Sequence, residues 1–179
     1  ILGIKLLMTN RAKRRLATLV GLIILFGIIL AILVAVRREF RDRAAAEASV
    51  KGMEFYAQGD WQLALPLLSQ ALSRQGDDLE LRLALARTRS EVPTDFEGEH
   101  LRQALSLYSS TRDLAVSTPN VDRELLAEAY LGCARLQAMG IGEVPLIRLK
   151  ESAEALWQFD PPDARAIPYL LFLRKIVSD

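Results

Sequence analysis

The longest apolar run of the chain extends from Leu16 to Val36, where every residue is apolar or glycine except Thr18. A helix of these 21 residues is about 31 Å long, which matches the hydrocarbon thickness of a bilayer. Fifteen of the residues are Leu, Ile, Val or Phe, and together they favour membrane insertion by roughly 5–9 kcal/mol. The run therefore predicts a transmembrane helix.

Two other kinds of segment share this pattern. A cleaved signal peptide has an apolar region of only ~7–15 residues and a small-x-small cleavage site, whereas this run ends in Val36-Arg37-Arg38. A buried helix of a soluble protein can be equally apolar, but basic clusters flank this run on both sides. We interpret the run as an uncleaved membrane anchor.

Beyond the apolar run, hydrophobic residues recur with a helical period, and turn residues separate the helical segments. Residues 37–58 contain no Pro and one Gly, so the membrane helix should continue without a break to about Gln58. Gly59-Asp60 should end this helix and cap the next. Further helices are expected at 61–72, at 78–91, up to about 116, at 121–139, at 145–159 and from near Pro168 to about 177. A capping box from Thr94 to Glu97 should precede the helix that ends near 116. No segment alternates with a period of two, so the pattern predicts an all-α fold.

The charge of the chain is divided unevenly. Residues 1–43 contain nine basic and two acidic residues, and residues 44–179 contain 14 basic and 20 acidic residues. The net acidic part excludes a basic nucleic-acid-binding face, and the basic part suits anionic lipid headgroups. Four basic residues lie close to each end of the apolar run, so the positive-inside rule leaves the orientation open, with a cytoplasmic N-terminus favoured slightly.

Residue types that perform chemistry are sparse. His100 and Cys133 are the single histidine and cysteine, and no cluster of suitable companions predicts a metal site or a nucleophile-base pair, so we expect no enzyme activity and no cofactor. We expect His100 to face solvent and Cys133 to be buried. Gly140-Ile141-Gly142 lacks the third glycine of a dinucleotide loop and predicts a turn. The acidic pairs Asp77/Asp78 and Asp160/Asp163 lie at helix boundaries, where such residues act as caps.

Residues 45–78 resemble one tetratricopeptide repeat (TPR), the 34-residue helix-turn-helix unit. The matching positions are Gly52, Phe55, the Gly59-Asp60-Trp61 turn, Ala64, Leu68 and Ala71, while Gly76 stands where the family usually has proline. Small residues allow two helices to approach closely, and large ones fill the space beside them.

Later copies of the repeat depart further from the family pattern. The second copy uses Ala84 and Ala86 and continues with Ala104 and Tyr108, where Thr111 replaces a small apolar residue. The third extends from the segment AEAYLGCARLQAMG, with Leu131-Gly132 in the family's Leu-Gly positions, to Asp160-Pro161. A generic helical bundle is the alternative to a repeat array. The last helix, with its apolar YLLFLRKI segment, has no partner helix to cover it, whereas a repeat array needs each face covered. We therefore expect that the sequence is either a fragment of a longer solenoid or offers this face for something else to dock.

The resemblance implies a concave protein-binding groove lined by the first helices of successive repeats. Its residues would be Met53, Tyr56, Leu83 and Arg87. Some members clamp a C-terminal carboxylate with Lys and Asn in such a groove, but here only Arg87 is basic, which favours a mixed apolar groove. In the alternative, these side chains only pack on neighbouring helices. Within the membrane run, Gly27, Ala31 and Ala35 recur every four residues and form a ridge for helix contact, with simple lipid exposure as the alternative.

We therefore expect a single N-terminal transmembrane helix continuous with a TPR-like α-hairpin solenoid. The expected segments are a basic tail (1–15), the membrane helix (16–36), a helical stalk (37–44) and the repeat domain (45–179). The expected function is a membrane-anchored scaffold or accessory subunit that binds protein partners and lipid but neither nucleic acid nor a small-molecule substrate. The repeat domain should lie on the extracytoplasmic side of the membrane.

Two alternative functions remain open. One is a structural subunit of a larger membrane complex that is held mainly through its transmembrane helix. The other is the non-catalytic N-terminal part of a longer enzyme or receptor. The sequence leaves open which partner binds, and whether Met8 is the true start.

Overall fold

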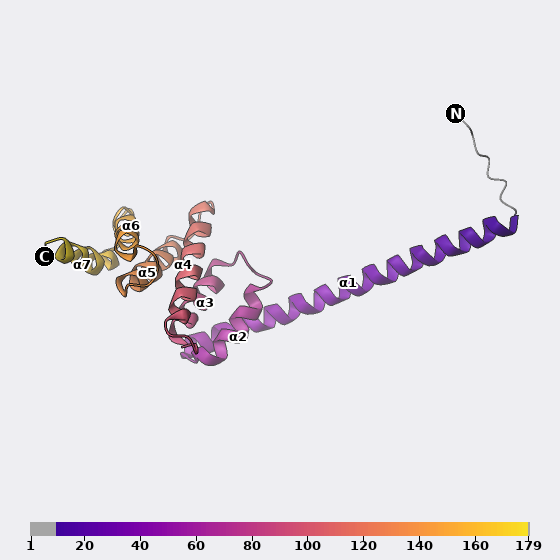
Figure 1. Cartoon of the computed structure of the whole chain (residues 1–179), viewed down its shortest axis with the longest axis horizontal. Helices are drawn as coiled ribbons and strands as arrows, with labels where there is room; N and C mark the ends of the chain where they lie inside the picture. Colours follow the sequence, from indigo (N-terminus) through magenta and orange to yellow (C-terminus); the bar gives the residue numbers. More distant parts are fainter. Residues whose placement is uncertain (1–9, 179) are drawn as a thin grey trace, which may run out of the picture. The chain divides into compact units, whose positions relative to one another are not determined.

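A computed structural model of the chain describes residues 10–178, with side chains described for Leu19 and for residues 21–178. This part of the chain is all-α, with seven α-helices and one short 3-10 helix (Figure 1). They are α1 (Asn10–Gln58), α2 (Trp61–Leu72), α3 (Leu79–Glu91), α4 (Glu99–Ser117), α5 (Arg123–Ala138), α6 (Pro145–Trp157), the 3-10 helix η1 (Ala164–Ala166) and α7 (Ile167–Ser178).

The long helix α1 confirms the expected continuity between the apolar run and the first helical pair. It extends unbroken from Asn10 to Gln58, and the chain divides into two compact units between Arg43 and Ala44. The first nine residues of the expected basic tail, Met8 among them, lie outside the described residues, and Asn10–Arg15 are already helical.

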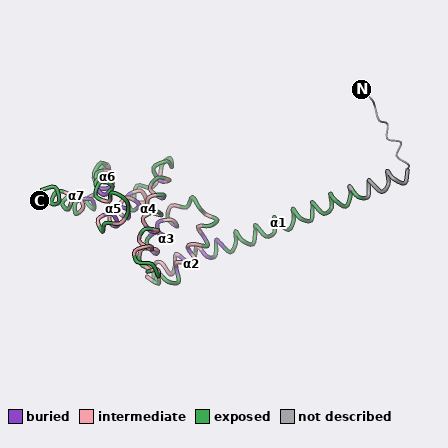
Figure 2. The backbone as a smooth tube through the Cα atoms, in the orientation of Figure 1, coloured by how far each residue is buried: buried purple, intermediate pink, exposed green. Residues whose placement is uncertain are grey.

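The apolar stretch of α1 exposes its side chains along its described length before Ala45 (Figure 2). From Gly21 on it is long and apolar enough to cross a membrane, and none of its most apolar segment is buried. A signal sequence near the N-terminus has the same length and composition. The structure thus has one helix of membrane-spanning character among the described residues.

The second unit consists of helices that pack in sequence, each on the next along the chain. The end of α1 packs with α2 and α3 around Ala48, Ala64 and Leu68. A second core cluster joins α3, α4 and α5 around Tyr108 and Cys133, which is buried as expected. The third joins α5, α6 and η1.

Most helix boundaries lie within two residues of the sequence expectation. Gly59 ends the α1 backbone with a φ of +78°, a conformation that glycine adopts without steric cost. The side chain of Asp78 accepts a hydrogen bond from the Leu81 N–H at 3.0 Å and so caps α3 as expected. Asp163 accepts from the Arg165 N–H at 2.9 Å and caps η1.

The caps expected at the starts of α2 and α4 are wrong. Asp60 occupies the N-cap position of α2 but makes no side-chain cap hydrogen bond. The capping box from Thr94 to Glu97 does not form, because α4 begins only at Glu99, after Gly98 in a left-handed conformation. The Thr94 hydroxyl donates instead to the carbonyl oxygen of Phe96 at 3.1 Å and stabilises the loop.

Glycines allow the closest helix approaches in the second unit. A Cβ built on Gly52 would lie 2.9 Å from Cδ2 of Leu68, and one built on Gly132 would lie 2.3 Å from the ring of Tyr108. Both glycines occupy positions where the repeat pattern expects a small residue. The ring of Tyr108 fills the space that a side chain at position 132 would need, and this contact holds α4 against α5.

The final helix α7 has no buried residue. Leu171, Phe172 and Ile176 are among its exposed apolar side chains. A groove of about 520 Å³ lies between α6 and α7, with Leu146, Ile147, Leu170 and Leu173 among its apolar lining. The expected uncovered apolar surface is therefore present at this end of the helical series.

Replacing Gly132 by alanine tests the importance of the contact with Tyr108. The added methyl group would overlap the ring, so Gly132→Ala should lower the free energy of unfolding by about 1–3 kcal/mol. Gly76→Ala is the control, because its Cβ would meet only the Leu72 carbonyl oxygen at 3.9 Å and should change stability by less than about 0.5 kcal/mol. Denaturant unfolding of the full chain in micelles, followed by circular dichroism, measures both. Equal effects of the two substitutions would contradict this packing.

Candidate protein-binding groove

The four groove residues predicted from the sequence line one cavity of about 220 Å³ in the second unit. Met53 and Tyr56 come from the end of α1, and Leu83 and Arg87 come from α3. The lining also includes Glu80, Ala84, Tyr108, Leu125 and Glu128, which the sequence analysis did not assign to the groove. We refer to this cavity as the groove.

The groove is built from one face of each contributing helix. On α3, Glu80, Leu83, Ala84 and Arg87 lie three or four residues apart and therefore share a face. This spacing could have identified Glu80 and Ala84 from the sequence. Leu125 and Glu128 of α5 show the same three-residue spacing, and α5 is the first helix of the third repeat copy, so the repeat pattern could have identified them as well.

Two tyrosines contribute polar groups to the groove. Tyr56 is half-buried, and its ring meets that of Trp61 edge-to-face with the centroids 5.5 Å apart. Tyr108 is almost fully buried, and burial raises the pKa of its hydroxyl to about 12, although Arg135 and Arg87 act in the opposite direction. Both hydroxyls lack a hydrogen-bond partner among the described residues, so each is available to a bound molecule.

Arg87 takes part in a charged group at the C-terminal end of α3. Its guanidinium lies 3.3 Å from Glu91, and that carboxylate is also 3.8 Å from Arg135. Arg135 donates a further hydrogen bond to the Ser90 hydroxyl at 2.8 Å. Two guanidinium groups therefore share one carboxylate, which leaves one net positive charge at this end of the groove.

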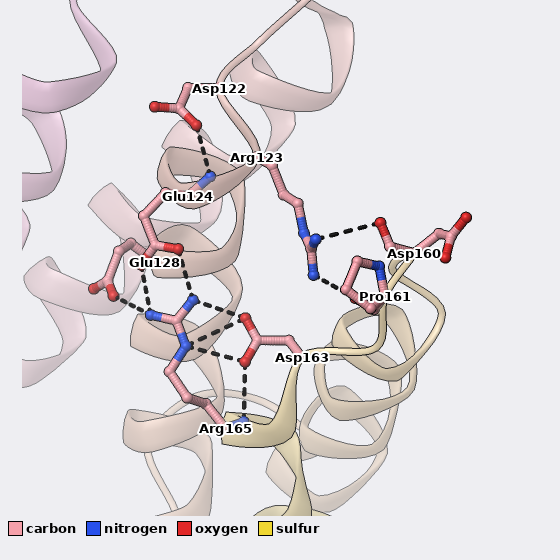
Figure 3. Close-up of polar contacts among 8 residues, drawn as sticks. All are labelled: Asp122, Arg123, Glu124, Glu128, Asp160, Pro161, Asp163 and Arg165. Carbon is pink, nitrogen blue, oxygen red and sulfur yellow. Dashed lines mark hydrogen bonds and ion pairs between the residues drawn. The ribbon is translucent and has the colours of Figure 1, made fainter.

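At the other end, Glu128 links the groove to a polar cluster formed by α5 and the segment 160–165 (Figure 3). Arg165 donates to Glu124 at 2.7 Å, to Glu128 at 2.8 Å and to Asp163 at 2.7 Å. The hydrogen bond from Arg165 lowers the pKa of Asp163, and the same bond raises the pKa of Arg165. One guanidinium thus compensates three carboxylates, and the cluster retains net negative charge.

Arg123 adds a second attachment between α5 and the same segment. Its guanidinium donates to the backbone carbonyl oxygens of Asp160, at 3.2 Å, and of Pro161. It also lies 5.5 Å from the centre of the Phe159 ring, within the range of a cation–π contact. Asp160 is therefore held through its backbone and makes no side-chain cap hydrogen bond, unlike Asp163.

A second polar cavity of about 390 Å³ lies between α4, the 141–144 loop and α6. Arg112, Gln137 and Arg148 are among its lining residues. The Gly140–Gly142 segment forms the expected turn, with positive φ at both glycines.

Neither of the residues considered for chemistry lies with suitable companions. The expectation of a solvent-facing His100 is wrong, because the residue is half-buried and its Nδ1 is enclosed without a hydrogen-bond partner. Burial raises the pKa of the Cys133 thiol to about 11, so the sulfur is protonated at neutral pH. Across the described residues, no group of three His, Cys, Asp or Glu side chains is arranged to hold a metal ion.

The predicted transmembrane contact residues lie on the exposed part of α1. Gly27, Ala31 and Ala35 are four residues apart and therefore share one face of the helix. A Cβ added at Gly27 would meet no atom within 4 Å. The face that carries these three residues is exposed in the described structure.

Comparison with known proteins gives no relative for this chain. No protein-family model matches it, and neither the curated proteins nor the solved structures contain a significant match.

The polar cluster should contribute measurably to stability. Arg165→Met removes the hydrogen bonds to Asp163, Glu124 and Glu128, so it should lower the free energy of unfolding by about 1 kcal/mol after allowance for solvent screening. Arg148→Met is the control, because Arg148 pairs only with Glu151 on the same helix and should cost less than about 0.5 kcal/mol. Denaturant unfolding measures the difference, and equal losses would contradict a structural role for the cluster.

The raised pKa of Tyr108 predicts a loss of stability in alkali. Both the folded and the unfolded state keep this proton below about pH 10, but above it the unfolded state loses the proton first. Stability should therefore fall as the pH rises from about 10 to about 12, at about 1.4 kcal/mol for each unit by which the pKa is raised. Urea unfolding at a series of pH values measures the slope.

Tyr108→Phe isolates this effect, because it keeps the ring against Gly132 and removes the ionisable group. The variant should show a shallower loss of stability above pH 10. Tyr169→Phe, on the partly exposed side of α7, should leave the slope of the wild type unchanged. An unchanged slope in Tyr108→Phe would show that the Tyr108 hydroxyl is not buried.

Proposed function

We propose that the protein is a membrane-anchored scaffold or accessory subunit whose TPR-like helical domain binds a protein partner through the groove. The observation that carries this proposal is the convergence of Met53, Tyr56, Leu83 and Arg87 on one cavity. These four residues span 34 positions of the sequence, from Met53 to Arg87, and they were selected by the repeat pattern alone. The repeat pattern expects these four residues to line one groove, and they line one cavity.

The packing of the helices supports the TPR-like assignment. Gly52, Ala64, Leu68 and Ala71 meet at the contact between α1 and α2, where the repeat pattern places small and large residues in the same order. Gly132 and Tyr108 form the equivalent close contact between α5 and α4. The longer joints at 92–98 and 118–122 account for the weaker periodicity of the later copies.

The long helix supports the membrane part of the proposal. Its exposed apolar surface is costly in water, and a bilayer removes it from water. Because α1 also supplies two groove residues, the groove is formed on the anchoring helix itself. Anchoring would confine the groove to the membrane surface and raise the effective concentration of partners there. The net acidic residues 44–179 favour a protein partner over a nucleic acid.

The ridge of Gly27, Ala31 and Ala35 favours a second candidate function, in which the protein is a structural subunit held mainly through its transmembrane helix. Small residues four positions apart allow close approach of another helix in a bilayer. This candidate differs from the first in where the partner binds, because groove substitutions would leave such a complex intact.

Membrane extraction tests the proposed function. The full-length chain of 20.0 kDa should stay in the membrane after alkaline carbonate treatment. After mild detergent extraction it should co-migrate with a second protein in a fixed ratio, identified by native sizing and mass spectrometry. A soluble, shortened chain would show that the apolar run is a cleaved signal sequence. A lone chain in its micelle would contradict the subunit role.

A matched variant controls for the anchor. Arginine at Leu25 and Ile29 should abolish carbonate-resistant retention, since each charge costs about 2.5–3.5 kcal/mol near the centre of a membrane helix. Glu47→Gln, on an exposed part of α1 outside the apolar run, should behave as the wild type.

A further inference from the structure

The charges around the groove are separated along α3. Glu80 lies in the first turn of this helix and has no ion-pair partner among the described residues. Arg87 lies seven residues further along the same face, with the net positive charge that it shares with Arg135 and Glu91. At 1.5 Å per residue, the two positions are about 10 Å apart along the helix.

The polar cluster reinforces the negative end. Glu128 lines the groove, and its Oε1 accepts from Arg165, while Oε2 makes no hydrogen bond within the described part of the chain. Because Arg165 compensates three carboxylates, net negative charge remains next to Glu128. Glu128 lies seven residues from Arg135 along α5, just as Glu80 lies seven residues from Arg87 along α3, so each carboxylate is about 10 Å along its helix from a guanidinium that pairs with Glu91. We call Glu80 and Glu128 the acidic end of the groove, and Arg87 with the neighbouring Arg135 its basic end.

The centre of the groove is suited to an apolar side chain. Met53, Leu83 and Leu125 give it apolar lining, and Leu83 lies between Glu80 and Arg87 along α3. Its volume of about 220 Å³ is below the ~300–1,000 Å³ typical of small-molecule sites, so it holds a side chain of a larger ligand better than a whole metabolite. The unpartnered hydroxyls of Tyr56 and Tyr108 can donate hydrogen bonds to backbone carbonyl oxygens of such a ligand.

From these features we infer that the groove binds an extended segment of a partner protein in which a basic and an acidic residue flank an apolar one. An extended chain advances about 3.3 Å per residue and its side chains alternate between two faces, so side chains that enter one groove are two or four positions apart. A spacing of four positions, about 13 Å, reaches both charged ends through long side chains and leaves the residue midway between them facing the groove. The basic residue pairs with Glu80 and Glu128, the acidic residue pairs with Arg87, and an apolar residue between them occupies the centre. This inference rests on the proposed function, since it specifies the partner of the same groove.

Peptide selection tests this inference directly. A random peptide library displayed on phage is selected against the full chain in nanodiscs of neutral phosphatidylcholine, which avoids attraction of basic peptides to anionic lipid. The enriched peptides should share a basic and an acidic residue four positions apart, with an apolar residue midway between them. A spacing of seven positions, as in a helical ligand, would overturn the inference of an extended segment.

Charge-removing variants assign the two ends. Selection on Glu80→Gln should lose the basic preference and keep the acidic one, and selection on Arg87→Gln should do the reverse. Glu154→Gln, on α6 outside the groove, should enrich the wild-type pattern. For one enriched peptide, Glu80→Gln should weaken binding about three- to tenfold, and the effect should disappear when the basic residue of the peptide is replaced by alanine.

The outcomes separate this inference from the proposed function. Peptides whose binding depends on Tyr56 or Leu83 but that lack paired charges would overturn the inferred charge pattern. The proposal that the groove binds a protein would still stand. The absence of any enriched peptide would contradict both proposals. Circular dichroism of each variant verifies that it is folded, so a loss of preference reports on the groove.

Discussion

The close approach of helices at glycine and alanine positions is the constraint on which the second unit depends. Gly52 lets Leu68 of α2 contact the backbone of α1, and Gly132 lets the ring of Tyr108 lie against α5. Where the helices approach this closely, side chains such as Leu68 fill the remaining space and bury apolar surface. A side chain at either glycine would separate the helices and displace the residues beyond the contact.

This packing also determines the properties of the groove. Tyr108 lies in the groove wall because its ring is held against Gly132, and its burial keeps the hydroxyl protonated far above neutral pH. Met53 and Tyr56 line the groove because the end of α1 packs with α2 and α3. The charged residues of the groove are held by different ion pairs. Arg87 and Arg135 share Glu91, and Arg165 attaches Glu128 to the segment after α6. Helix packing and ion pairing together give the surface its shape and its charge separation.

Much of the fold was predictable from the sequence because its signals are local. The apolar run, the unbroken helix to Gln58, the turn at Gly59 and the later helices follow from periodicity and turn residues. Predictions from the sequence were wrong where two local signals compete, or where tertiary contacts determine the burial of a residue. Thr94 and Glu97 match a capping box, but Gly98 starts α4 later. His100 is half-buried because of packing that a single-sequence pattern does not contain.

The groove shows the same division. Met53, Tyr56, Leu83 and Arg87 were identified by a repeat resemblance, whereas Leu125 and Glu128 were missed because the third copy departs further from the repeat pattern. The polar cluster was not anticipated, since Arg165 and its partner Glu124 are 41 residues apart.

Site-specific photocrosslinking in native membranes tests the central claim most directly. A benzophenone side chain replaces Tyr56 in the groove, and Phe96, on an exposed loop outside it, serves as the matched aromatic control. We expect a crosslink from position 56 to one protein that mass spectrometry identifies, none from position 96, and a weaker crosslink in the Arg87→Gln background. A membrane-retained, folded chain that crosslinks only to lipid from position 56, or equally from both positions, would contradict this claim.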